Sequence, residues 1–151
     1  MGSGGIGKTS AGLHIFHHPD VVHRFEHHRY FVATTVLKDA QAKFVEIGEV
    51  LGATQCIQIL GGISSYQGNY AESSIMLNEA REQFIKTGNQ LGAAQCLRAL
   101  GDNVRFEGKY AEAKNLLTQA RGECLNIAYS LGVEQCESSL SKVVTESSRW
   151  R

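Results

Sequence analysis

The chain has 151 residues, with 15 basic and 15 acidic side chains and a hydrophobic content of 42%. This suits one ordered domain, and a net charge of zero gives no electrostatic argument for nucleic acid as a partner. No apolar run approaches the roughly 18 residues of a membrane span, and no signal peptide is evident. Together with four cysteines in no C-x-x-C spacing, this predicts a cytoplasmic protein with reduced thiols.

A phosphate-binding pattern opens the chain at residues 2–10, GSGGIGKTS. It fits the Walker A consensus, in which glycines turn backbone N–H groups toward phosphate oxygens, a lysine reaches the terminal phosphates and a hydroxyl ligates Mg²⁺. A helix over about residues 8–17 would direct its positive end at the phosphates of Mg-ATP or ADP. The candidate nucleotide-binding residues are Gly2, Gly4, Gly5, Gly7, Lys8, Thr9 and Ser10, with Thr9 as the magnesium ligand.

The next stretch contains a proline, a cluster of histidines and a β-branched run. Pro19 is expected to stop the short helix, and residues 29–34, RYFVAT, predict a buried strand. All six histidines lie between His14 and His28, and some have the spacing of zinc ligands on a helix. No cysteine and few carboxylates are near them, so we interpret this stretch as a solvated face and predict no metal site.

An internal repeat accounts for the rest of the chain. Residues 44–83 and 84–123 align without a gap and are identical at 16 of 40 positions, and a third unit begins at residue 124. Such a period indicates stacked structural units. Positions that keep the phase are Leu51, Leu91 and Leu131, the glycines that follow them, Cys56, Cys96 and Cys136, and, extending backwards, Leu37 and Ala40.

Each unit predicts two helices, here over about residues 91–107 and 110–128, with a break at Gly108 as at Gly68. Neither helix can bury its apolar stripe alone, so neighbouring units must stack. We expect the in-phase cysteines to lie in the core as small hydrophobes rather than in a redox or metal site. The predicted inward positions are Leu91, Ala94, Leu97, Leu100 and Val104 in the first helix and Ala113, Leu117, Ala120 and Cys124 in the second.

The unit resembles the tetratricopeptide repeat (TPR) over about residues 36–146. The matching residues are Leu100, Gly101, Ala113, Leu117 and Ala120, and, one unit earlier, Leu60, Gly61, Ser73, Leu77 and Ala80. The period exceeds the usual length of about 34, and the usual proline near the end of the unit is absent. The resemblance implies an all-α solenoid of antiparallel helix pairs, whose first helices line a concave surface that binds a protein or peptide.

The same resemblance implies candidate residues in that groove. They are Gln55, Gln58, Tyr66, Gln95, Arg98, Asp102, Arg105 and Gln135. For any one of them, a solvated polar face without a partner is the alternative interpretation.

The opening segment, GSGGIGKTS followed by HHPDVVHRF and RYFVAT, resembles the start of an NB-ARC domain. These domains belong to the STAND class of signalling NTPases, the class of NOD-like receptors, and fungal members commonly continue into TPR-like repeats. The resemblance divides the chain into a truncated P-loop remnant over residues 1–35, with its loop, helix and strand, and TPR-like repeats over residues 36–147.

The Walker B strand and a residue to position water are missing from this sequence, so we predict a non-enzymatic interaction scaffold that requires no cofactor. Binding of ATP or ADP in an NB-ARC-like switch is the alternative. The repeats begin near Leu37 with the second helix of a pair, and the opening segment occupies the place of its first helix. The residues left without that helix as their usual partner are Val36, Leu37, Ala40 and Phe44. We therefore expect residues 10–30 to fold back as a cap, or this end to self-associate.

Overall fold

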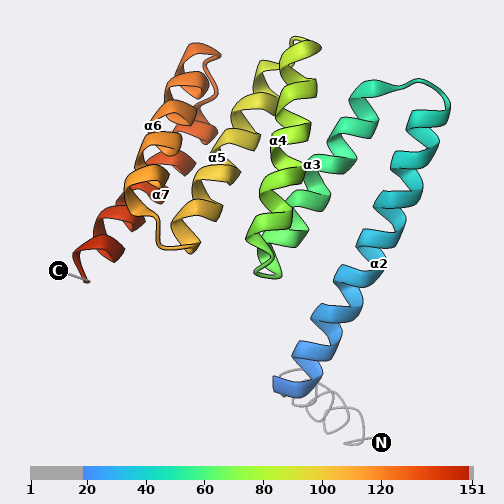
Figure 1. Ribbon diagram of the computed structural model, residues 1–151, viewed down its shortest axis with the longest axis horizontal. Helices are drawn as coiled ribbons and strands as arrows, with labels where there is room; N and C mark the ends of the chain where they lie inside the picture. The colour runs from blue at the N-terminus through green and yellow to red at the C-terminus, as the bar shows by residue number, and fades with distance from the viewer. Residues whose placement is uncertain (1–18, 150–151) are drawn as a thin grey trace, which may run out of the picture. The chain divides into compact units, whose positions relative to one another are not determined.

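The computed structural model describes the backbone of residues 19–149 and the side chains of residues 26–149. Within that range it contains helices and no strand. The chain divides into two compact units, Met1–Val36 and Leu37–Arg151, and in the second unit each helix from α3 to α7 packs against the next (Figure 1). The predicted all-α, TPR-like solenoid of helix pairs is therefore confirmed. The helices are α2 (Pro19–Glu46), α3 (Val50–Tyr66), α4 (Tyr70–Lys86), α5 (Gln90–Phe106), α6 (Tyr110–Asn126) and α7 (Ser130–Ser148).

The prediction of a strand over residues 29–34 is wrong, because this segment lies inside α2. Pro19 does not stop a helix but is the first residue of one, a position where its missing N–H costs nothing. No glycine or further proline occurs between Pro19 and Gly48, so nothing interrupts the helix. A short β-branched run without a neighbouring strand does not overcome that continuity.

The turns between helices repeat one geometry. Gly48, Gly68, Gly88 and Gly108 each follow a helix with φ between 73° and 80°, the left-handed conformation that glycine adopts without steric cost. The N–H of Gly88 donates to Ile85 O at 3.1 Å, and the next N–H donates to Phe84 O at 2.8 Å. These bonds satisfy carbonyl groups at the helix end, and the predicted breaks at Gly68 and Gly108 are confirmed.

Ala128 takes the glycine position in the turn between α6 and α7, with φ 55°. We expect Ala128→Gly to raise the free energy of unfolding by about 1 kcal/mol, because a side chain in this conformation is strained. Gly88→Ala should lower it by a similar amount, since the added methyl group meets nothing within 4 Å and changes only the backbone energy. Urea denaturation measures both variants, and equal midpoints for Ala128→Gly and the wild type would contradict the prediction.

The core lies where large side chains of the second helix of each pair (α4 and α6) pack against glycines of the first helices (α3 and α5). A Cβ on Gly61 would lie 3.0 Å from Leu77 Cγ, and a Cβ on Gly92 would lie 2.7 Å from the Phe84 ring. These glycines therefore let the helix axes approach closely. The second-helix residues at most 1% exposed are Ser73, Leu77, Ala80, Phe84, Ala113, Leu117, Ala120 and Cys124.

The predicted inward positions are confirmed with one exception. Ala113 and the other three inward positions of α6 are buried, as are Ala94, Leu97, Leu100 and Val104 of α5. Leu91, however, is 43% exposed. The contact at the start of α5 is made instead by its neighbour Gly92 against Phe84, so Leu91 lies on the other side of the first turn.

At the beginning of the repeats, the apolar side chains are less covered than their equivalents one unit later. Leu37, Ala40 and Phe44 are half-buried, and Val36 is 60% exposed. The cap or self-association predicted for this end concerns residues 10–30, and part of that segment lies outside the described residues. It therefore stays a prediction.

Candidate functional site

A groove of about 620 Å³ lies along the three first-type helices α3, α5 and α7. Consecutive units each contribute one of these helices, so the groove forms only when the units stack. Its wall combines hydroxyl, cationic and aromatic side chains. The lining residues are Gly62, Ser65, Tyr66, Tyr70, Arg98, Ala99, Asp102, Arg105, Phe106, Gln135, Ser138, Ser139 and Lys142.

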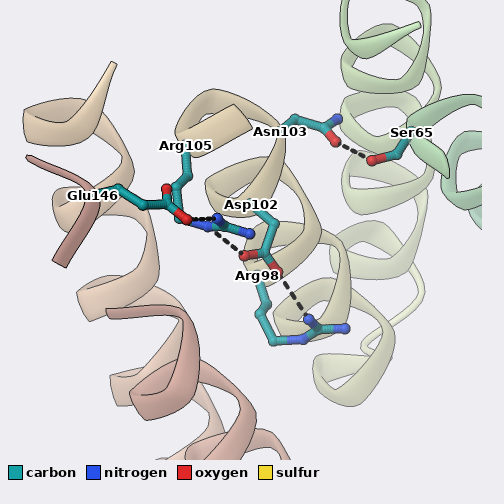
Figure 2. Close-up of polar contacts among 6 residues, drawn as sticks. All are labelled: Ser65, Arg98, Asp102, Asn103, Arg105 and Glu146. Carbon is teal, nitrogen blue, oxygen red and sulfur yellow. Dashed lines mark hydrogen bonds and ion pairs between the residues drawn. The ribbon is translucent and has the colours of Figure 1, made fainter. Parts of the chain in front are cut away.

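An ionic cluster centred on α5 lies in the groove wall (Figure 2). Arg98 Nη1 donates to Asp102 Oδ2 at 3.1 Å, and Arg105 Nε lies 3.5 Å from Asp102 Oδ1. Arg105 Nη1 also donates to Glu146 Oε1 of α7 at 2.8 Å. Arg105 is only 6% exposed, so its burial depends on these carboxylates to compensate the charge.

Aromatic side chains also contribute to the groove wall. The rings of Tyr70 and Phe106 stack with centroids 5.4 Å apart, and the Arg105 guanidinium lies 4.2 Å from the centre of the Phe106 ring. Tyr66 is 83% exposed and Phe106 is 52% exposed. Exposed tyrosine beside arginine is the composition of energetically dominant residues in protein interfaces.

A buried polar network holds α3 and α4 against α5 behind this wall. Asn103 Nδ2 donates to Ser73 Oγ at 2.8 Å and to Ser74 Oγ at 3.2 Å. Its Oδ1 accepts a hydrogen bond from Ser65 Oγ at 2.6 Å (Figure 2). Asn103 is 1% exposed, and these bonds satisfy its donor and acceptor groups. The network therefore positions the α3–α4 helix pair relative to α5.

Helix pairs with this packing, and a groove formed by their first helices, are the architecture that the resemblance to the TPR implies. Residues 53–122 match the tetratricopeptide repeat. No curated protein matches the chain. TPR proteins are generally non-enzymatic modules that bind other proteins.

The groove along α3, α5 and α7 contains five of the eight candidate residues that the TPR resemblance implied. Tyr66, Arg98, Asp102, Arg105 and Gln135 line it. The three others lie outside the lining set. Gln58 Nε2 donates to Gln95 Oε1 at 3.2 Å and joins α3 to α5, whereas Gln55 is exposed.

The sequence interpretation missed groove residues that the 40-residue period of the chain would have supplied. Phe106 occupies the repeat position of Tyr66, and Lys142 occupies that of Asp102. Ser138 likewise follows Arg98 by one period. Carrying every candidate through all three units would therefore have found them. Tyr70, from the start of α4, has no such signal because it reaches the groove from a second-type helix.

The cysteines behave as core residues, as predicted. Cys56, Cys96, Cys124 and Cys136 are all buried and free. Burial raises the pKa of the Cys96 thiol to about 12 and that of Cys136 to about 11. Because the thiolate is the nucleophile and the metal ligand, these thiols serve packing.

The other predicted sites fall on the opening segment. The candidate nucleotide-binding residues, Gly2 through Ser10, lie outside the described residues. In the part of the chain that the structure describes, no three His, Cys, Asp or Glu side chains gather as metal ligands would. No helix of that part has the length and apolar character needed to cross a membrane.

Proposed function

We propose that this chain is a protein-interaction module that binds an extended segment of another protein in the groove along α3, α5 and α7. The observation that carries the proposal is the convergence of predicted partner-binding residues on one cavity: Tyr66, Arg98 and Arg105 all line it. An exposed tyrosine and two arginines give this surface the chemistry of an interface centre. The general role of TPR proteins supports the same function.

A second hollow, of about 370 Å³, lies at the outer helices α4 and α6, but its charges are already matched. Arg81 forms two hydrogen bonds with Glu123, at 2.8 and 3.0 Å, and a third with Ala93 O at 2.7 Å. This arrangement ties the outer helices of consecutive units together. It therefore supports a structural role for the outer hollow and leaves the groove as the better candidate for a partner.

Crosslinking tests which surface binds the partner. A photoreactive amino acid at Tyr66 should crosslink a partner in cells, whereas the same residue at Ile75, which is 71% exposed on α4, should not. With the recovered partner, Arg98→Glu should weaken binding by about 30-fold or more, as expected when a dominant interface residue is reversed. Arg121→Glu, at an exposed ion pair with Glu137, is the control. Partner capture through Ile75 alone would contradict the proposal.

A second candidate function, binding of ATP or ADP as part of an NB-ARC-like switch, is favoured by the complete G-x-x-x-x-G-K-T pattern at residues 2–9. Its support is the sequence pattern alone, and the helical state of residues 29–34 removes the strand from the resemblance to a STAND NTPase. The division at residues 35 and 36, the STAND origin and the cytoplasmic location also stay predictions. Titration with Mg-ATP, using Lys8→Ala as the control, distinguishes this function from partner binding.

A further inference from the structure

The arginines of the groove already bind carboxylates of the chain itself. Glu146 Oε1 of α7 lies 2.8 Å from Arg105 Nη1 of α5. Its side chain keeps 34% exposure, whereas that of Arg105 keeps 6%, so Glu146 covers the guanidinium from the solvent side. Glu146 is not among the groove-lining residues, although Arg105 is. Arg105 therefore contributes to the groove wall, while its guanidinium is held by a carboxylate from outside the lining residues.

The charge of the groove is not balanced by these contacts. Arg98, Arg105 and Lys142 line it together with a single acidic residue, Asp102, and counting Glu146 still leaves one positive charge in excess. Among residues 26–149, no hydrogen bond or ion pair engages the Lys142 ammonium. Lys142 and Glu146 both belong to α7, one helical turn apart, so this cation lies next to the carboxylate that covers Arg105.

Building on the proposed function, we propose that the partner segment is acidic and that Glu146 is a built-in competitor, which the segment displaces from Arg105. The exchange replaces one carboxylate on the guanidinium by another, so the buried charge of Arg105 stays compensated throughout. The Lys142 ammonium, which forms no ion pair with Glu146, also attracts the acidic segment. Tyr66 and Phe106, both exposed, offer apolar contact to a side chain next to the acidic group.

The test uses the full chain and three short fluorescein-labelled peptides that share one phenylalanine and differ in carrying glutamate, glutamine or lysine around it. Fluorescence anisotropy should show that the wild type prefers the glutamate peptide and that this preference declines with salt. Glu146→Gln should tighten binding of the glutamate peptide by about tenfold, and Lys142→Gln should weaken it. Glu137→Gln removes the same charge from the exposed pair with Arg121 and should leave the affinity unchanged.

Glu146→Asp guards against a folding defect in the glutamine variant, because it keeps the charge and shortens its reach to Arg105; it should also tighten binding. Unchanged or weaker binding in both Glu146 variants would overturn the competitor role. Preference for the glutamine or lysine peptide would overturn the acidic partner, while crosslinking through Tyr66 would still support the groove as the docking site. Failure of all three peptides, together with no crosslink from Tyr66, would overturn the proposed function as well.

Discussion

Gly101→Ala is expected to lower the free energy of unfolding by about 1–3 kcal/mol, the usual cost of overpacking a core. The added Cβ would lie 2.7 Å from Leu117 Cγ and 3.3 Å from Leu117 N. Leu117 is 0% exposed, so its side chain has no space into which to move. The backbone contact means that a change of rotamer alone cannot relieve the overlap, and α5 and α6 must separate.

The matched control is Gly122→Ala. Gly122 lies within α6, and a Cβ there meets nothing within 4 Å. Because alanine favours a helix interior over glycine by about 0.5–1 kcal/mol, this variant should be more stable than the wild type. Urea denaturation followed by circular dichroism measures both. If Gly101→Ala were as stable as Gly122→Ala, close approach at Gly101 would not be what holds α5 against α6.

Asn103→Ala is expected to lower the free energy of unfolding by about 2–3 kcal/mol, since it removes three hydrogen bonds and leaves a small cavity. The change would leave Ser73 Oγ, in a residue that is 0% exposed, without the donor at 2.8 Å. Asn115→Ala, at an exposed position of α6, should be neutral or slightly stabilising because alanine is the better helix former.

A double-mutant cycle with Ser73→Ala separates the network from general packing. The two residues share one hydrogen bond, so the double variant should be more stable than the sum of the single effects predicts, by about 0.5 kcal/mol or more. Thermal or urea denaturation of the four proteins gives this coupling energy. Strict additivity would show that Asn103 acts through its volume alone.

The repeat made most of the fold predictable. A period of 40 residues with 16 identities constrains every unit at once, so helix type, the breaks at Gly68 and Gly108 and the inward faces all follow from one pattern. Two incorrect predictions, Pro19 as a helix stop and a strand at residues 29–34, lie before the first complete unit, where a single copy of the sequence offered only local propensity. A third, Leu91 as an inward position, lies at the start of α5, where Gly92 makes the contact with Phe84 instead. Local propensity is a weak guide where several helix-compatible residues flank a short β-branched run.

The sequence by itself determined the stacked helix pairs, the burial of the cysteines and the set of helices that carry Tyr66, Arg98, Asp102, Arg105 and Gln135. Only the tertiary structure decided which of these polar residues share one groove and what they contact. Glu146 reaches Arg105, and Asn103 reaches Ser65, across neighbouring units. A helical period specifies the face on which a side chain lies but not the distance to the next helix. That distance depends on how the glycines and large side chains at the crossing points fit together.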